Sequence, residues 1–297
     1  MTDPAQALKD FKPKHEFLVG IDSDGCAFDT MEIKHKECFI PNIINEWELQ
    51  AISKYARAAA EFVNLYSKWR GINRFPALIM VFDLLAEWDE VKKREVKIPE
   101  VHSLRAWMKK ETKLGNPALQ KVVEETKDPV LTQTLKWSKA VNDTIARFVH
   151  GVPPFPFVRE SLEEISKLAD IVVVSQTPGE ALKREWEEHS IAKYAAVIAG
   201  QEMGSKKEHL AMAMNGRYAP NHVLMIGDAP GDLQAALPNK ALFFPINPGA
   251  EDASWELFYK EGFRKFMDGK YAGDYEKRLV EKFNTYLPDV PPWKKRK

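Results

Sequence analysis

The stretch FLVGIDSDG, residues 17–25, decides the fold. Five apolar or small residues are followed at once by Asp22, Ser23, Asp24 and Gly25. A short apolar run of this kind is typical of a strand buried on both faces of a parallel sheet. Ligands of open α/β sheets bind at the carboxyl ends of such strands. The stretch therefore predicts a buried strand whose end presents two carboxylates to a site.

Four more short apolar runs follow in the second half of the chain. They cover residues 171–174, 196–199, 223–226 and 241–244, and helical patterns separate them. Strands that alternate with helices form a parallel sheet with helices on both faces. We therefore expect an α/β protein whose core is a doubly wound, Rossmann-like parallel sheet.

A different pattern occupies residues 32–150. Apolar side chains recur there at offsets of three and four, which marks helix faces, and no convincing strand interrupts them. We expect an all-helical domain inserted after the first strand, so that residues 1–31 and 151–297 form a discontinuous core. The segment after about residue 250 has a helical pattern, and its sequence gives no functional signal beyond packing on that core.

The bulk composition argues against several classes of protein. Lysine plus arginine number 43, as do aspartate plus glutamate, so no net charge draws the chain to nucleic acid or an anionic membrane. There is no apolar run of about 18 residues and no apolar region of a signal peptide. Cys26 and Cys38 are too few for a disulfide framework. We expect a cytoplasmic protein that binds neither nucleic acid nor membrane, and the sequence does not indicate its oligomeric state.

Asp22 and Asp24 carry the strongest chemical signal. Two carboxylates at a buried strand end cost desolvation and repulsion, and a bound divalent cation removes that cost. One aspartate can then attack phosphorus, while its neighbour protonates the leaving oxygen and later deprotonates water. Gly25 lets the chain turn sharply beside the phosphate. The alternative is an ordinary Asx-type turn, since aspartate, serine and glycine are common turn residues.

Two more strand ends carry groups that suit a phosphate. Ser175, Gln176 and Thr177 follow the second strand, where a hydroxyl and exposed backbone N–H groups can hold phosphate oxygens. The alternative for the hydroxyls is helix capping. Lys206 and Lys207 open a helix after the third strand, where a lysine opposes the helix dipole unless an anion is bound. The alternative is a solvated surface lysine.

The fourth strand is followed by Asp228 and Asp232, which extend the acidic group. Magnesium prefers oxygen ligands, with one or two carboxylates completed by water and phosphate. The alternative role for both aspartates is helix capping. All four motifs fall at the carboxyl ends of predicted parallel strands, and this shared position makes a single phosphate site with Mg²⁺ the stronger interpretation.

Taken together, these motifs resemble those of the haloacid dehalogenase superfamily. Four stretches match in order, namely IDSDGCAFDT, VVVSQT, GSKKEHL and MIGDAPGD. A helical insert directly after the first motif is similar to the C1 cap of subfamily I, which would close over the site and select the substrate. Two residues depart from the usual pattern. Cys26 stands where many relatives have threonine, either as a packing residue or as an oxidation-sensitive thiol, and Gln176 stands where asparagine is frequent.

The resemblance implies a role for each motif residue. Asp22 would be the nucleophile and a metal ligand, and Asp24 the general acid and base, with its backbone carbonyl also binding the metal. Ser175 would hold the transferring phosphoryl group together with Gln176. Lys206 would neutralise charge between nucleophile and phosphate, although a shift by one residue to Lys207 stays open. Asp228 would complete the metal site. Asp232 would bind the metal directly or support the residues that do.

The activity implied is Mg²⁺-dependent hydrolysis of a small phosphorylated metabolite, a phosphomonoester, through an aspartyl-phosphate. A carboxylate at Asp24 favours an oxygen leaving group, because oxygen benefits from a proton donor. The same residues suit a phosphomutase that acts on a sugar phosphate. A third possibility is a catalytically silent binding protein on this fold. The substrate itself is not encoded in any motif.

One further candidate lies in the insert. The stretch RGINRFP, residues 70–76, joins two apolar helices and is polar and cationic. Arg74 in this stretch could bind an anionic substrate. The alternative is a solvated connector between helices.

Overall fold

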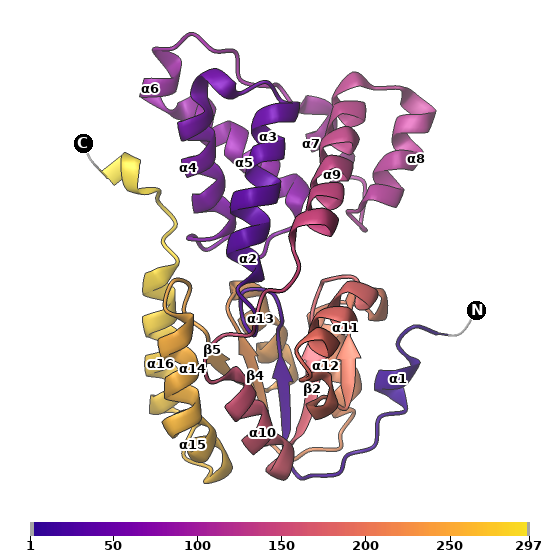
Figure 1. The fold of residues 1–297 in the computed structure, drawn as a ribbon, viewed down its shortest axis with the longest axis vertical. Helices are drawn as coiled ribbons and strands as arrows, with labels where there is room; N and C mark the ends of the chain where they lie inside the picture. Colours follow the sequence, from indigo (N-terminus) through magenta and orange to yellow (C-terminus); the bar gives the residue numbers. More distant parts are fainter. Residues whose placement is uncertain (1–2, 296–297) are drawn as a thin grey trace. The chain divides into compact units, whose positions relative to one another are not determined.

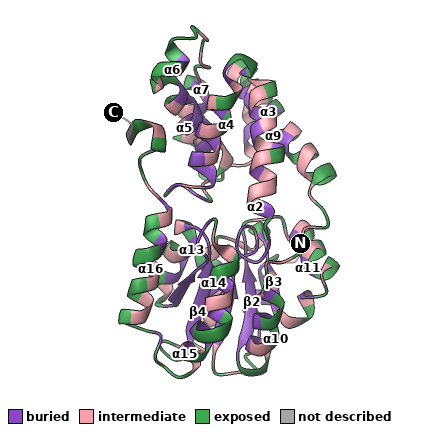
Figure 2. Cartoon of the chain, turned by 60° about the vertical axis from the view of Figure 1, so that its left-hand side comes forward, coloured by how far each residue is buried: buried purple, intermediate pink, exposed green. Residues whose placement is uncertain are grey.

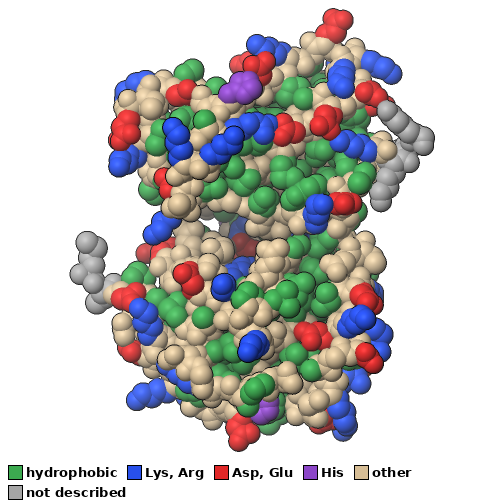
Figure 3. Space-filling model, turned by 180° about the vertical axis from the view of Figure 1, so that it is seen from behind, with side chains coloured by type: hydrophobic (Ala, Val, Ile, Leu, Met, Phe, Trp, Pro, Cys, Tyr) green, Lys and Arg blue, Asp and Glu red, His purple; other side chains and the backbone are tan. Residues whose placement is uncertain are grey.

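The computed structural model describes residues 3–295, and the chain divides into two compact units (Figure 1). One unit, the core, comprises Met1–Met31 and Gly151–Leu287. The other, the helical unit, comprises Glu32–His150 and Pro288–Lys297. None of the helices in the described range is long and apolar enough to cross a membrane. In Figure 3, acidic and basic side chains are interspersed over the face in view.

The core is built on one five-stranded sheet in which all neighbouring strands are parallel. The strand order is β3-β2-β1-β4-β5. The strands are β1 Leu18–Ile21, β2 Asp170–Val174, β3 Val197–Ala199, β4 Val223–Gly227 and β5 Leu242–Pro245. Each begins and ends within one residue of the run predicted from the sequence. Ile21 pairs with Val173 of β2 and Ile226 of β4, so these central strands end at the same level.

Helices cover both faces of the sheet, which confirms the predicted doubly wound α/β architecture. Alternate strand residues point to opposite faces. Val19 and Ile171 face one apolar cluster, whereas Leu18 and Val172 face the other. Strands β1, β2, β4 and β5 are buried throughout, and in β3 only Ile198 is half-buried (Figure 2). The core helices are α1 Gln6–Lys9, α10 Val158–Leu168, α11 Gly179–Glu188, α12 Lys206–Met214, α13 Pro230–Ala236, α14 Glu251–Leu257, α15 Phe263–Met267 and α16 Asp274–Tyr286.

The helical unit contains helices and no strand among its described residues, because its apolar positions follow helical spacing. Its chain enters through α2, Thr30–Ile33, which continues through a π-helical turn, Lys34–Phe39. One apolar cluster, which includes Phe82 and Trp137, forms its interior. The other helices are α3 Ile40–Glu46, α4 Ser53–Asn64, α5 Arg74–Glu87, α6 Asp89–Lys92, α7 His102–Met108, α8 Asn116–Thr126 and α9 Pro129–Phe148.

The segment after Leu287 groups with the helical unit, although the sequence analysis assigns residues up to 297 to the core. The physical reason is an aromatic contact. The ring of Trp293 stacks on that of Trp88 with centroids 4.0 Å apart, and it meets the edge of Phe62 at 5.7 Å. Lys294 forms an ion pair with Glu87, 2.5 Å between Nζ and Oε2. Neither contact could be read from the sequence pattern of a terminal segment.

Replacing Trp293 with alanine should destabilise the helical unit by roughly 2 kcal/mol, because the stacked and edge contacts are lost. The near-ultraviolet circular dichroism of the stacked tryptophan pair should disappear at the same time. Lys294→Ala serves as the control, since an exposed ion pair contributes little. A Trp293→Ala variant with unchanged denaturant stability and an unchanged spectrum would contradict the contact.

Candidate active site

Three aspartates meet at the carboxyl edge of the sheet. Asp22 follows β1, Asp228 follows β4, and Asp232 lies in the first turn of α13. All three are buried, and each offers a carboxylate oxygen within 4.8 Å of the other two. The structure therefore brings together acidic side chains that are more than two hundred residues apart in sequence. We call Asp22, Asp228 and Asp232 the acidic cluster.

Lys206 is bound to two members of this cluster. Its Nζ lies 2.7 Å from Oδ2 of Asp22 and 2.6 Å from Oδ1 of Asp232, and its side chain is 16% exposed. Lys207, the neighbour left open by the sequence, is exposed. The difference follows from the helix start, because Ser205 forms a capping box with Glu208 and so fixes where α12 begins.

The electrostatics of the cluster reflect burial and crowding. Burial raises the pKa of the Asp22 carboxyl well above its usual range, the ammonium of Lys206 opposes that rise, and Asp232 and Asp228 add to it by repulsion. Burial alone would lower the pKa of Lys206, but Asp22 and Asp232 raise it above its usual value. Three carboxylates with one ammonium leave two formal negative charges in a buried position.

Asp232 has two functions in the fold. Its Oδ1 binds Lys206, and its Oδ2 accepts a hydrogen bond from the backbone N–H of Ala229 at 3.0 Å, which caps α13. The capping alternative raised by the sequence is thus present together with the cluster. Gly227 makes this placement possible, because a Cβ there would lie 2.3 Å from Cβ of Asp232.

Asp24 is held by two hydroxyl groups of the core. Thr30 donates to its Oδ1 at 2.5 Å, and Thr177 donates to its Oδ2 at 2.7 Å. Gly25 follows with a φ of 75°, the left-handed region that favours glycine, and its N–H donates to the carbonyl of Phe28. The tight turn and the threonines together set the direction of the Asp24 carboxyl group.

Ser175 and Gln176 lie at the carboxyl end of β2, on the same edge of the sheet. Ser175 is buried, and its Oγ accepts a hydrogen bond from the N–H of Thr177 at 3.1 Å. Gln176 is exposed, and its side-chain amide donates to the carbonyl of Gly204 at 3.0 Å. Neither side chain caps α11, because its N-cap residue is Pro178 and the N–H of Gly179 in its first turn donates to Oε2 of Glu202. The capping alternative for this stretch is therefore wrong.

Arg74 belongs to the helical unit and is bound there to α9. Its Nη1 donates to the carbonyl and Oγ of Ser138 and to Oδ1 of Asn142, at 2.7–3.1 Å. The guanidinium also lies over the ring of Phe39, and burial lowers its pKa to about 10. Arg74 is thus bound by side chains of its own unit and is not a freely solvated residue of a connector. Its role in substrate binding stays a prediction.

The thiol of Cys26 is fully buried beside the site. Its Sγ lies 3.7 Å from the carbonyl oxygen of Ile226. Burial raises the pKa of this thiol well above its usual value, with further repulsion from Asp228. A thiol that is inaccessible and protonated is unreactive. Of the two roles considered from the sequence, packing is the one that fits this environment.

His209, one turn after Lys206, gives the core an acid-sensitive group. Burial lowers its pKa from 6.5 to about 4, and the charge of Lys206 adds to the effect. Below pH 6.5 the unfolded chain therefore binds a proton that the folded core does not bind. Stability should fall as the pH falls from 6.5 to about 4, by up to about 3 kcal/mol, and the imidazole adds no dependence above that window.

Urea unfolding across this pH range checks the prediction. His209→Leu should remove this share of the acid dependence. His102→Gln is the matched control, because that imidazole is exposed and 84% of its side chain is accessible. An identical pH dependence in the wild type and the His209→Leu variant would contradict the assignment.

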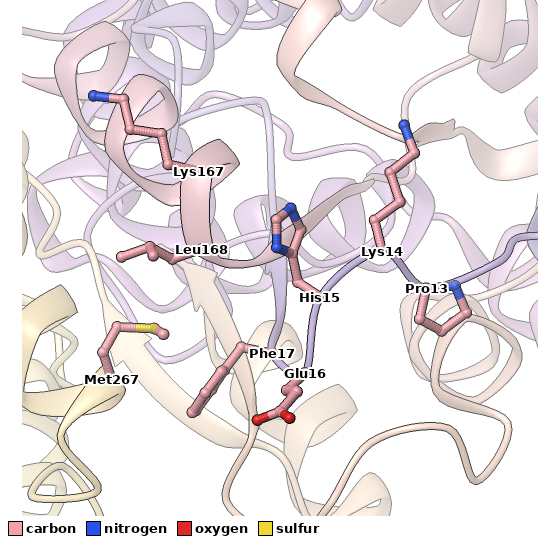
Figure 4. A pocket seen from close by; sticks show the side chains of 8 residues that line it. All are labelled: Pro13, Lys14, His15, Glu16, Phe17, Lys167, Leu168 and Met267. Carbon is pink, nitrogen blue, oxygen red and sulfur yellow. The ribbon is translucent and has the colours of Figure 1, made fainter.

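A surface hollow of about 560 Å³ lies at the opposite edge of the sheet (Figure 4). Two of the residues that line the hollow are Phe17 and Leu168. Phe17 immediately precedes β1 and Leu168 lies just before β2, so the hollow is at the amino ends of these strands. Lys14 and Lys167 also line this hollow. The acidic cluster lies at the carboxyl ends of the strands, which is the other edge of the sheet. The chemistry of the residues, and not the size of a hollow, therefore identifies the candidate site.

One protein-family model matches part of the chain. The model of the haloacid dehalogenase-like hydrolases matches residues 99–243. This range contains Ser175, Lys206, Asp228 and Asp232 and leaves out Asp22, which the sheet brings beside them. No curated protein gives a significant match.

Several solved structures are similar to the chain. A haloacid dehalogenase-like hydrolase from Streptococcus pneumoniae is 14% identical, with 81% of this chain and 90% of that chain covered and a TM-score of 0.40. A subfamily IA hydrolase from Geobacter sulfurreducens is 12% identical, with 79% and 90% covered and a TM-score of 0.41. A predicted phosphoglycolate phosphatase from Haemophilus somnus is 12% identical, with 78% and 86% covered and a TM-score of 0.42.

Proposed function

We propose that this chain, which belongs to the haloacid dehalogenase-like hydrolases, hydrolyses a small phosphomonoester with Asp22 as the nucleophile and Mg²⁺ as the cofactor. The single observation that carries the proposal is the acidic cluster with Lys206 at the carboxyl edge of the sheet. Asp22 is the member that follows the central strand, and Asp24 lies two residues further along the same turn.

The donor set suits a divalent cation such as Mg²⁺. Asp22, Asp228 and Asp232 supply hard oxygen ligands close together, and the four charged groups of the site leave two negative charges to balance. The backbone carbonyl of Asp24 is the further ligand that the family resemblance implies. Bound there, the cation would offset the repulsion between carboxylates and phosphate and polarise the phosphoryl oxygens.

In the first step, a carboxylate oxygen of Asp22 attacks phosphorus, and the bond from phosphorus to the leaving oxygen breaks. The leaving alkoxide takes a proton from Asp24, which starts this step protonated. The products are an alcohol and an aspartyl-phosphate on Asp22. Lys206 remains an ammonium throughout, because Asp22 and Asp232 raise its pKa, and it offsets the negative charge of the phosphoryl group.

In the second step, water attacks the aspartyl-phosphate. Asp24 takes the proton from water, the bond from phosphorus to the Asp22 oxygen breaks, and inorganic phosphate leaves. Both proton transfers use the same carboxyl group, so its direction matters. Thr30 and Thr177 hold that group by its two oxygens. Ser175 and Gln176, at the neighbouring strand end, are proposed to bind phosphoryl oxygens.

A panel of small phosphomonoesters, with p-nitrophenyl phosphate as the generic member, tests the function. Wild-type protein with Mg²⁺ should release inorganic phosphate, and Asp22→Asn should reduce the rate by at least about 10³-fold. An isomerised sugar phosphate without free phosphate would instead indicate a mutase. A wild-type protein that binds neither Mg²⁺ nor fluoroberyllate would be a silent binding protein. Retained turnover in Asp22→Asn would overturn the nucleophile.

A cytoplasmic site of action stays a prediction from the sequence. The two cysteines, Cys26 and Cys38, are buried free thiols. The class of substrate that we propose is a small phosphorylated metabolite, and the panel of substrates is the experiment that identifies it.

A further inference from the structure

Ser23 lies between the two catalytic aspartates and makes contacts that the proposed reaction does not use. The residue is fully buried. Its Oγ accepts a hydrogen bond from Nε1 of Trp186 at 3.0 Å and donates one to Oε2 of Glu185 at 3.2 Å. The Ser23 hydroxyl therefore uses its donor on a carboxyl oxygen of Glu185 and one of its acceptor positions on the indole N–H of Trp186.

The backbone of Ser23 organises the turn around it. Its N–H donates to Oδ1 of Asp22 at 2.8 Å. Its carbonyl accepts hydrogen bonds from the N–H groups of Cys26, Ala27 and Phe28, at 2.9–3.2 Å. One residue thus binds the carboxylate that precedes it and holds the turn that follows it. A displacement of Ser23 would change the direction of both neighbouring aspartates.

Helix α11 supplies the anchor for this residue. Trp186 is fully buried, and its ring meets that of Phe28 edge-on, with centroids 6.0 Å apart. The same helix begins two residues after Thr177, whose hydroxyl binds Asp24. The segment from Thr177 to Trp186 therefore contacts three residues of the first motif, namely Ser23, Asp24 and Phe28.

We infer that Ser23, anchored by Trp186 and Glu185, is a positioning residue that sets the direction of Asp22 and Asp24. The inference rests on the proposed function and adds to it a set of residues remote from the substrate. Ser23 acts through its neighbours, because successive side chains of an extended segment point to opposite sides. Its hydroxyl points to α11, and the carboxylates on either side serve the site.

Three variants test the inference with p-nitrophenyl phosphate as the substrate. Ser23→Ala removes the hydroxyl, Trp186→Phe removes the indole N–H and keeps an aromatic ring, and the double variant removes both. Each single variant should lower kcat roughly 10-fold and leave KM within about 2-fold, because the geometry of attack changes while substrate contacts stay. The double variant should lose little more than either single variant, since both changes break the same contact.

Ser161→Ala is the matched control. Ser161 is a buried serine of the same unit, and its hydroxyl has no hydrogen-bond partner among the described residues. Denaturant unfolding of every variant separates lost folding from lost positioning, and Trp186→Phe carries the test if Ser23→Ala does not fold. Suppose that the wild type is active and Asp22→Asn is inactive. A kcat for Ser23→Ala and Trp186→Phe equal to that of Ser161→Ala would then overturn the positioning role alone. An inactive wild type would overturn the proposed function and this inference together.

Discussion

Lys206→Met is expected to abolish turnover and to destabilise the core by about 3 kcal/mol in metal-free buffer. The ammonium of Lys206 contacts Asp22 and Asp232, and only 16% of the side chain is exposed. Its removal leaves the buried carboxylates of Asp22 and Asp232 without the ammonium that each of them contacts. Urea unfolding and the rate of phosphate release measure the two effects.

Mg²⁺ should restore much of the lost stability of Lys206→Met and none of the lost turnover, because the cation balances charge but cannot replace the ammonium beside Asp22. Lys207→Met is the matched control, since it removes the same charge from the next residue of the same helix, where the side chain is exposed. Equal behaviour of Lys206→Met and Lys207→Met would contradict the site as we describe it.

Asp228→Asn is expected to remove the response of the protein to Mg²⁺. For the wild type, Mg²⁺ at a hundred times its Kd should raise the free energy of unfolding by about 2.7 kcal/mol. The variant lacks one of the three oxygen ligands and should show little of this increase. Its rate of phosphate release should fall at least about 100-fold, and EDTA should have the same effect on the wild type.

Asp170→Asn is the control for this change. Asp170 is also a buried aspartate of the core, but it binds the backbone N–H groups of Lys14 and His15. That variant should be less stable than the wild type and should still gain the full stabilisation from Mg²⁺. If Asp228→Asn kept the same gain, the cation would have to bind elsewhere.

The strands and the polar motifs that follow them could be predicted, because both depend on local sequence. Five apolar runs end at polar motifs, and parallel strands bring their carboxyl ends to one edge. For this reason Asp22 and Asp228 could be expected in one place, although the chain separates them widely. The choice between Lys206 and Lys207 was beyond the sequence pattern, because it depends on the residue at which α12 begins.

Other features depend on tertiary contacts that no local pattern encodes. Trp186 and Glu185 lie in the second half of α11, where an apolar residue beside a charged one is ordinary for an amphipathic helix. Their contact with Ser23 follows only from how α11 packs on the sheet. Trp293 is similar, since one tryptophan in a basic terminal segment gives no indication of the ring on which it stacks.

The most direct test of the account is to find where the phosphoryl group is bound during turnover. Wild-type protein mixed with Mg²⁺ and an accepted phosphomonoester should be quenched in acid, digested and analysed by mass spectrometry. We expect one phosphoryl group on Asp22 and none in Asp22→Asn. A phosphoryl group on another residue, or steady turnover with Asp22 unmodified at every quench time and unimpaired in Asp22→Asn, would contradict it.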